Sequence, residues 1–324
     1  MEGSSRFTVT LSPGQLVPAN LVGGKAAQLA ELTSLGLPVP RAICVTITAY
    51  RAYLMENQLD DWLNRTLQRV VPGDYAAMLT ASEEIRERFA AAPVPSRIAE
   101  EILEGYHAIH RIDALEPGPV AVRSSASDED GRIASFAGQC ETKLNVRGGE
   151  AVVKAVVDCW ASVHSERALL YRARHGILGQ ECAAGVVVQR LVPADRAAVV
   201  FSVNPVDGDR SCVVIDATWG LGEAIVSGLV TPDHYVVSKA DLGIRVRQVS
   251  NKPVMTAALP EGGTAEQPVP ENLRLAPSLG DAQVLELART AIHLEQVRRH
   301  PVDVECAYHG SQLALLQCRP ITTL

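Results

Sequence analysis

The sequence predicts a mixed α/β protein with two lobes. Its 324 residues exceed the size at which one hydrophobic core usually stops growing, about 250–300 residues. Apolar residues return at helical spacing through much of the first half, whereas short runs of β-branched residues separated by turn residues dominate the second half. We therefore expect an N-terminal lobe over residues 1–184 and a C-terminal lobe over residues 185–324.

Helices are predicted where apolar side chains recur with the period of a helical turn. In the first helix, over residues 22–35, Leu29, Leu32 and Leu35 share one side, and Gly36 follows as a helix stop. Thr48 is expected to cap the next helix. Further helices are expected over most of 60–112, with breaks at 71–73 and 93–95, and over 149–163 and 281–298.

Strands are predicted where β-branched residues cluster between turn signals. These strands are expected at residues 41–47, 120–123, 142–146, 185–189, 197–203, 212–217 and 234–238. Many Pro, Gly and polar residues make 257–280 a predicted long surface loop. A final hairpin is predicted, with strands at 302–308 and 313–318 joined by a turn at 309–311.

Charge, cysteine content and hydropathy exclude several classes of protein. The formal net charge is −7 with acids and bases interspersed, so we expect no nucleic-acid partner. The seven cysteines include no C-x-x-C pair, which favours reduced thiols and a cytoplasmic protein. There is neither a secretory leader nor a run of about eighteen apolar residues, so we expect a protein that is neither secreted nor membrane-spanning.

A candidate anion site lies at the start of the first helix. Gly23 and Gly24 expose backbone N–H groups at the positive end of the helix dipole, and Lys25 adds a full charge. The segment is not a Walker A loop, because Ala26 stands where that loop needs Ser or Thr. The alternative interpretation is an ordinary junction between a loop and a helix.

A second candidate for phosphate binding follows the strand predicted at 120–123. Arg123 ends this strand and is followed by Ser124 and Ser125, so its guanidinium and these hydroxyls can hold phosphate oxygens. The alternative is a capping box further along the loop, with Arg123 paired to a local acid. The small residues of 134–139 favour phosphate binding, because they let the backbone approach a polyphosphate closely.

The predicted final hairpin carries a third set of polar residues. Asp303 and Glu305 alternate on one strand, as Gln317 and Arg319 do on the other, so each pair shares a face and strand pairing brings all four together. Hard oxygen donors from Glu305 and Gln317 suit Mg²⁺, and Arg319 can offset charge on a transferred group. The alternative is a surface cross-strand ion pair between Arg319 and an acid. Together the three sets predict a nucleoside triphosphate site.

Several of these segments, in the same order, resemble the N-terminal ATP-binding domain shared by pyruvate phosphate dikinase, phosphoenolpyruvate synthase and rifampin phosphotransferase. The resemblance covers essentially the whole chain. It rests on the segments LVGGKAAQLAEL, VAVRSSASDEDGRIASFAGQCET, GVVVQRLV, FSVNP, WGLGEAIVSGLVTPD and DVECAYHGSQLALLQCRPI. The chain departs from the family at Cys306, where a large aromatic is common, and at Ala197 and Ala198, which replace Ser-Gly.

The resemblance implies an ATP-grasp-like fold, with ATP in a cleft between two lobes. It implies phosphate contacts from Lys25 and Arg123, which would act in catalysis together with Arg319 at the transferred phosphoryl group. A loop that covers the phosphates would include Ser135, Ala137, Gly138 and Gln139, and the adenine pocket would include Gln189, Leu191 and Val192. Asp303, Glu305 and Gln317 would serve Mg²⁺ and the ribose or phosphates, with Glu305 and Gln317 as metal ligands.

The resemblance also implies a phosphotransferase. Full-length members carry a swivelling domain with a phosphorylatable histidine in a Gly-rich motif, and none of the eight histidines here lies in such a motif. We therefore expect transfer of the β-phosphoryl group of ATP, with release of AMP, to a histidine on a separate chain or missing domain. Two alternatives remain open: a stand-alone kinase for a small molecule, and a nucleotide-binding regulatory subunit without turnover.

Overall fold

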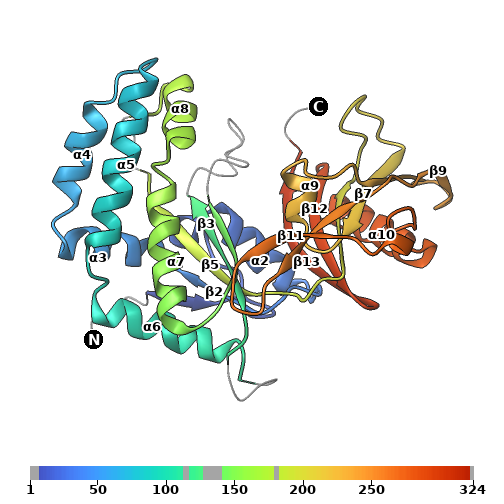
Figure 1. Cartoon of the computed structure of the whole chain (residues 1–324), viewed down its shortest axis with the longest axis horizontal. Coiled ribbons are helices and arrows are strands. Elements are labelled where there is room, and N and C mark those ends of the chain that lie inside the picture. Colours follow the sequence, from blue (N-terminus) through green and yellow to red (C-terminus); the bar gives the residue numbers. More distant parts are fainter. Residues whose placement is uncertain (1–6, 112–116, 127–140, 179–181, 322–324) are drawn as a thin grey trace. The chain divides into compact units, whose positions relative to one another are not determined.

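The chain folds into two compact units (Figure 1). This structure is a computed structural model that describes residues 7–111, 117–126, 141–178 and 182–321. The first unit comprises residues 1–36 and 41–191, and the second comprises residues 37–40 and 192–324. The boundary expected at 184/185 thus lies at the start of a strand that belongs to the first unit.

The first unit contains a five-stranded antiparallel sheet. In spatial order its strands are β1 (Thr8–Thr10), β2 (Ala42–Val45), β5 (Ala184–Arg190), β3 (Val120–Ala126) and β4 (Thr142–Val146). The sheet therefore places β2 beside β5 although the two strands are far apart in the sequence.

Helices account for most of the rest of the first unit. They are α1 (Ala19–Val22), α2 (Gly24–Ser34), α3 (Ile47–Glu56), α4 (Asp60–Gln68), α5 (Tyr75–Ala91), α6 (Ser96–Ala108), α7 (Gly149–Ser162) and α8 (Glu166–Arg174). The predicted breaks at 71–73 and 93–95 are confirmed, because they separate α4, α5 and α6. The predicted cap of α3 at Thr48 is wrong: β2 ends earlier, and the side chain of Thr46 accepts the hydrogen bond of the Ala49 N–H at 3.3 Å.

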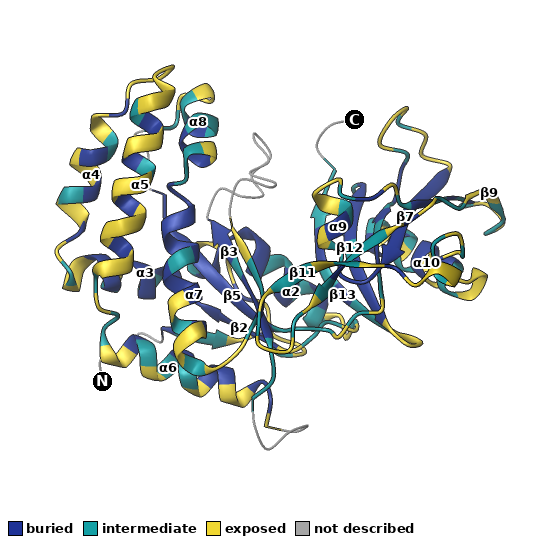
Figure 2. Cartoon of the chain, in the orientation of Figure 1, coloured by how far each residue is buried: buried dark blue, intermediate teal, exposed yellow. Residues whose placement is uncertain are grey.

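The core of the first unit lies between one face of the sheet and the helices. Val122 and Val188 on β3 and β5 are fully buried there with aromatic residues of α3 and α7, such as Tyr53 and Trp160, whose ring centroids lie 5.1 Å apart. Figure 2 shows β3, β5 and the inner side of α7 as buried, whereas the outer sides of α4, α5 and α6 are exposed. Apolar burial of this kind is the main favourable contribution to folding.

The opposite face of this sheet packs against α1 and α2, and a glycine between these helices permits the close contact. Gly23 has a φ of +81°, and a Cβ added there would lie 1.8 Å from the backbone oxygen of Ser125 on β3. Gly14 has a similar φ of +74°, but nothing lies within 4 Å of its added Cβ. Backbone conformation and lack of space therefore both require glycine at position 23.

This comparison gives a prediction on stability. Gly23→Ala should lower the free energy of unfolding of the first unit by about 2–4 kcal/mol, since strain at positive φ adds to steric overlap. Gly14→Ala should cost only the conformational part, about 1–2 kcal/mol. Urea unfolding of both variants measures the difference, and equal losses would show that the contact of Gly23 with Ser125 does not limit the packing of α2.

The second unit is built on a six-stranded antiparallel sheet. In spatial order its strands are β13 (Gln312–Pro320), β12 (Val302–His309), β6 (Arg196–Phe201), β7 (Cys212–Trp219), β8 (Asp233–Ser238) and β9 (Ile244–Gln248). The helix α10 (Asp281–Arg298) packs on one face of this sheet, and the short helix α9 (Glu223–Val226) contacts β7. The predicted helix at 281–298 and the predicted final hairpin are both confirmed.

The predicted surface loop at 257–280 is wrong in part. β10 (Val254–Ala258) and β11 (Thr264–Pro268) form an antiparallel hairpin, and a 3₁₀ turn follows at Glu271–Leu273. The strands contain Pro and polar residues because the hairpin is a separate two-stranded sheet whose side chains are mostly half-buried or exposed. Local composition therefore predicted a loop where pairing between two segments produces strands.

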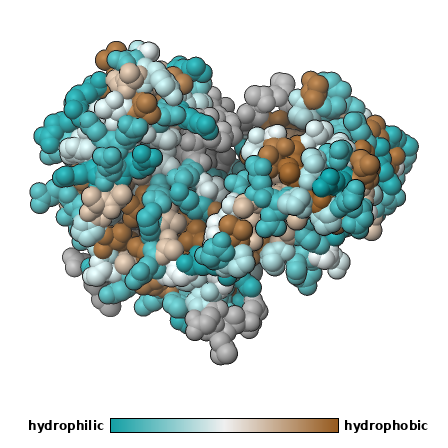
Figure 3. Space-filling view, in the orientation of Figure 1, coloured by the Kyte–Doolittle hydropathy of each residue, from teal (hydrophilic) through white to brown (hydrophobic). Residues whose placement is uncertain are grey.

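The surface and the cysteines bear on two further expectations. On the face that Figure 3 shows, hydrophobic residues occur in small groups among hydrophilic ones. Over the described residues, every helix is too short or too polar to cross a membrane. The cysteines within the described ranges form no disulfide. Burial raises the pKa of the Cys44, Cys159 and Cys306 thiols above the usual value of a cysteine. Because the reactive form of cysteine is the thiolate, these three buried thiols are unreactive.

Candidate functional site

In the first unit, the structure brings Lys25 against β3, which carries Arg123 at its centre and continues past the strand end predicted at Arg123 to Ala126. Lys25 is buried, with 8% of its surface exposed, and its Nζ donates a hydrogen bond to the backbone oxygen of Ser124 at 2.8 Å. The N–H of Ala26 donates to Oγ of Ser125 at 3.0 Å. These bonds fix the start of α2 on β3, so the positive end of the helix, the Lys25 ammonium and the Arg123 strand lie together.

Sheet register places Arg123 and Gln189 on the face that α1 and α2 cover. In the β3–β5 ladder Ala121 pairs with Gln189, Arg123 with Val187 and Ser125 with Gly185. Paired residues of antiparallel strands, and residues two apart on one strand, share a face. A Cβ on Gly185 would lie 2.3 Å from the Val22 backbone oxygen, which identifies this as the α1 side. Lys25, Arg123 and the buried Gln189 therefore belong to one side of the sheet.

The other residues predicted in the first half are placed only in part. Leu191 follows β5, and its N–H donates to the backbone oxygen of Pro119 at 3.0 Å. Val192 is the next residue and begins the second unit. The phosphate-covering residues predicted from sequence lie outside the described residues; they are Ser135, Ala137, Gly138 and Gln139.

The sheet of the second unit has one buried face and one open face. Side chains on the α10 face are almost fully buried, as Val200, Val304 and Tyr235 show with 1%, 2% and 0% of their surface exposed. Tyr308, on the same face as Val304, donates a hydrogen bond to Oε2 of Glu286 on α10 at 2.7 Å. The alternating residues point to the other face, where most are only half-buried, and we call this the open face.

Four residues predicted from the sequence lie together on the open face. Asp303 pairs directly with Arg319 across the β12–β13 ladder, and Glu305 pairs directly with Gln317. Pairs directly opposite each other have neighbouring Cβ atoms, so each acid lies next to a polar residue of the facing strand. Within the described residues no group of at least three His, Cys, Asp or Glu side chains could hold a metal ion by itself. Glu305 and Gln317 are two oxygen donors on this face that could share a cation with a ligand.

The alternative predicted for Arg319, a cross-strand ion pair, is present in the structure. Nε of Arg319 donates to Oδ2 of Asp303 at 2.7 Å. The pair is not a surface pair, however, because only 7% of the Asp303 side chain is exposed, against 31% for Arg319. Burial raises the pKa of Asp303, and the charge and hydrogen bond of Arg319 oppose this effect without cancelling it.

The open face also carries a polar pair that sequence reasoning missed. His234 on β8 and Asp216 on β7 are cross-strand partners, and Nδ1 of His234 lies 2.8 Å from Oδ1 of Asp216. In the ladders, Glu305 pairs with Val199 on β6, and Val199 pairs with Asp216, so all of these residues share one face. Only the order of the strands shows that these residues share a face, since they are far apart in the sequence.

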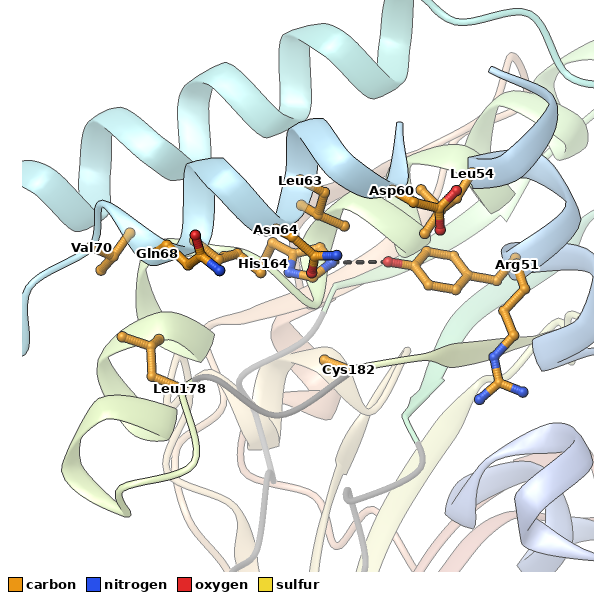
Figure 4. Close-up of a pocket in the computed structure, with 12 residues that line it drawn as sticks. Arg51, Leu54, Asp60, Leu63, Asn64, Gln68, Val70, His164, Leu178 and Cys182 are labelled. Atoms are coloured by element: carbon orange, nitrogen blue, oxygen red, sulfur yellow. Dashed lines mark hydrogen bonds between the residues drawn. The ribbon is translucent and has the colours of Figure 1, made fainter. Parts of the chain in front are cut away.

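A separate pocket of about 540 Å³ lies in the first unit, away from Lys25 and Arg123. Figure 4 shows the side chains that line it, among them Leu63, Leu178 and Cys182, with a dashed line marking a hydrogen bond of His164. Nε2 of His164 lies 3.0 Å from the Tyr50 hydroxyl, and both residues are buried. Burial, and then the charge of Arg172, lower the pKa of His164 to about 3.

The lowered pKa of His164 predicts how stability depends on pH. The folded chain keeps this imidazole neutral, whereas the unfolded chain binds a proton near pH 6.5. Above pH 6.5 His164 is neutral in both states and does not lower the free energy of unfolding. Below pH 6.5 the unfolded chain binds a proton that the folded chain excludes, so the free energy of unfolding falls by about 1.4 kcal/mol per pH unit until the pH approaches about 3. Urea unfolding of the native chain and of His164→Gln between pH 7 and 5 should show the smaller pH slope in the variant. Equal slopes would mean that His164 is protonated in the folded chain.

Comparison with known proteins identifies the family. The family model for the AMP/ATP-binding domain of pyruvate phosphate dikinase matches residues 19–324. The chain belongs to this family. The mixed α/β fold in two units that the sequence predicted is present in the structure. The match runs through both units and includes every described site residue discussed above.

Several relatives are similar over nearly the whole chain. A probable phosphoenolpyruvate synthase of Methanocaldococcus jannaschii is 39% identical over 99% of this chain and 27% of its own length. The phosphoenolpyruvate synthase of Pyrococcus furiosus is 36% identical over 94% of this chain and 42% of its own length. A rifampicin phosphotransferase of a Streptomyces species is 38% identical over 99% of this chain and 36% of its own length. The chain thus spans less than half the length of each of these relatives.

Proposed function

We propose that the chain is an ATP-dependent phosphotransferase unit. The observation that carries the proposal is that the AMP/ATP-binding family model extends over residues 19–324, and therefore through both units. The relatives described above carry the names of enzymes that transfer phosphoryl groups or make phosphoenolpyruvate. Each unit also holds, on one face of its sheet, part of the residue set predicted from the sequence.

In this proposal the first unit binds the phosphates and contributes most of the residues that bind the base. Lys25 supplies a compact charge at a helix start, and the Arg123 guanidinium can hold two phosphate oxygens at once. Gln189, Leu191 and Val192 belong to the adenine pocket. The buried position of Gln189 supports this role, because a buried amide side chain gives specific hydrogen bonds in a largely apolar pocket.

The second unit supplies Arg319 and the oxygen donors. Glu305 and the carbonyl of Gln317 fit Mg²⁺, which prefers hard oxygen ligands and commonly takes only one or two from the protein while phosphates and water supply the rest. Bound there, Mg²⁺ would neutralise charge on the phosphates of ATP. Arg319 stabilises the charge on the transferred phosphoryl group. Catalysis then depends on positioning and charge neutralisation, with no covalent nucleophile in this chain.

The acceptor in the preferred form of the proposal is a histidine on a separate chain or missing domain. The β-phosphoryl group of ATP ends on a histidine nitrogen, and the complete cycle consumes a water and releases AMP and phosphate. The alternative acceptor is a small molecule that takes a phosphoryl group directly. The similarity to a Streptomyces rifampicin phosphotransferase, whose name indicates such an acceptor, favours this second candidate.

Product analysis distinguishes the candidates. The chain is incubated with Mg²⁺-ATP alone, with the remaining part of the Methanocaldococcus jannaschii relative as a separate protein, or with rifampicin, and AMP, ADP and phosphate are followed. AMP formed only with the protein acceptor supports transfer to a histidine, and ADP formed only with the small molecule supports the kinase. ATP binding without any product in all arms would overturn both and indicate a regulatory nucleotide-binding unit.

A further inference from the structure

The pocket beside His164 lies where separate parts of the core of the first unit meet. Of the residues that line it, Leu63 belongs to the large cluster between the sheet and the helices, Val70 belongs to a second cluster and Cys182 to a third. Protein interiors are close-packed, and a gap that buried side chains leave unfilled lowers stability. A volume of about 540 Å³ is also within the usual range of small-molecule sites. The position and size of the pocket therefore indicate a place for a ligand.

The walls of the pocket combine an apolar interior with a polar rim. The residues of α4 that line it recur every three or four positions and so share one side of the helix; they are Asp60, Leu63, Asn64, Leu67 and Gln68. Leu54 on α3 and Leu63 are buried, whereas Asn64 and Gln68 are exposed. Small-molecule sites are commonly lined in this way, with mostly apolar side chains and a few polar groups that orient the ligand. The lining therefore favours a largely apolar molecule.

The two ring nitrogens of His164 are used differently. Nε2 lies 3.0 Å from the Tyr50 hydroxyl, but Nδ1 is buried and makes no hydrogen bond to the described residues. The two nitrogens of an imidazole point to different sides of the ring. In Figure 4 the dashed line leaves His164 toward the side of Arg51, whereas Gln68 and Val70 lie on its other side. A buried polar atom without a partner is costly, so Nδ1 is a hydrogen-bonding group available to a ligand in this part of the pocket.

The charges around this nitrogen define the chemistry of the ligand. Burial, and then the charge of Arg172, lower the pKa of His164 to about 3, so the imidazole that meets the ligand is neutral. The charge of Arg172 disfavours a cation, and the rim residues Arg51 and Asp60 carry opposite charges that favour neither sign. A neutral imidazole has one N–H and one acceptor, and a tyrosine hydroxyl can donate to Nε2 or accept from it. Nδ1 is therefore either a donor or an acceptor, and a ligand hydroxyl can pair with it in both cases.

We propose that this pocket binds a small, uncharged and largely apolar molecule whose hydroxyl group forms a hydrogen bond with Nδ1 of His164. The site is distinct from the residues assigned to ATP. Leu63 lines it on the helical side of the first sheet, whereas Lys25 and Arg123 lie on the α1 side. The proposal therefore does not depend on the proposed phosphotransferase function, and the molecule should not compete with ATP.

A matched pair of probes tests the hydrogen bond. 2-Naphthol and naphthalene differ only in the hydroxyl, and each is added to the full chain labelled with ¹⁵N-histidine. The Nδ1 signal of His164 should move with 2-naphthol, which should bind about fivefold more tightly than naphthalene, as one net hydrogen bond implies. Mg²⁺-ATP should not displace the probe. Failure of both 2-naphthol and the smaller p-cresol to bind would overturn the proposal, as would equal affinities for 2-naphthol and naphthalene or displacement by Mg²⁺-ATP.

Three variants locate the binding within the first unit. His164→Phe keeps a ring but removes Nδ1, so the preference for 2-naphthol should disappear while naphthalene still binds. Leu67→Trp fills the pocket from a half-buried position on α4 and should abolish binding of both probes. Leu79→Trp adds the same bulk at an exposed position on α5 outside the pocket lining and should bind both probes as the native chain does. Circular dichroism shows whether each variant is folded, and Leu67→Trp decides the test if His164→Phe is not. Unchanged binding in folded Leu67→Trp would place the probes elsewhere and overturn the proposal.

Discussion

Replacing Lys252 with methionine is expected to destabilise the second unit more than any other single change considered for that unit. The side chains of Lys252 and Asp233 are both completely buried, and the Lys252 Nζ lies 2.5 Å from Oδ1 of Asp233. Methionine fills a similar volume but leaves the carboxylate of Asp233 buried without its cation. Removing one partner of a buried ion pair usually costs about 3–5 kcal/mol, and we expect a loss of that size.

The surroundings of the pair explain why the cost is not avoided by local rearrangement. Asp233 also accepts hydrogen bonds from the backbone N–H of Ser250 at 2.9 Å and from the N–H and hydroxyl of Ser278, each at 2.7 Å. Lys252 donates a second bond to the backbone oxygen of Ser250 at 2.8 Å. The pair thus connects the start of β8 to two irregular segments, and the carboxylate cannot turn toward water without breaking these bonds.

Urea unfolding measures the effect of Lys252→Met. Arg245→Met is the matched control, because Arg245 makes an ion pair with Asp241 in the same unit but both side chains are more than half exposed. Exposed pairs contribute little, so the control should leave the free energy of unfolding nearly unchanged. A loss in Lys252→Met no larger than in Arg245→Met would show that the buried pair does not stabilise the unit.

Local sequence patterns predicted those helices and strands whose apolar periodicity and flanking turn residues lie within one segment. The helix predicted at 281–298 coincides with α10, and the strand predicted at 142–146 coincides with β4. Periodicity and turn residues are contained within one segment, so these features can be recognised without knowing the rest of the fold. Strand alternation likewise predicted that Asp303 and Glu305 share a face, as do Gln317 and Arg319. The pairing of Asp303 with Arg319, however, depends on a register shift between Glu305 and Cys306, which the turn does not specify.

The sequence alone could not show which distant segments meet. Nothing in it placed Lys25 against the backbone of Ser124, because that contact depends on α2 lying across β3 and β5. The β10–β11 hairpin and the Lys252 and Asp233 pair were missed for the same reason. The position of Asp216 and His234 on the same face of the sheet as Glu305 likewise depends on strand order, which single-sequence patterns do not encode.

Arg319→Ala is expected to have the largest effect on activity. Under the proposed function, the guanidinium neutralises charge on the phosphoryl group during transfer, and arginines with this role are worth about 10³–10⁵-fold in kcat. Binding of ATP should remain measurable, since Lys25 and Arg123 in the first unit still contact the phosphates in this proposal. Arg319→Lys keeps a positive charge opposite Asp303 but loses the planar group, so its loss should be intermediate.

Two measurements separate this effect from a loss of folding. Arg319→Ala also leaves Asp303 buried without its partner, so circular dichroism and urea unfolding must show that the variant is folded at the assay temperature. Arg289→Ala is the control, because Arg289 is exposed on α10, on the opposite face of the sheet, and its loss removes the same charge from the unit. Turnover should fall at least 10³-fold in Arg319→Ala and stay unchanged in Arg289→Ala. Normal turnover in a folded Arg319→Ala protein would remove Arg319 from the mechanism.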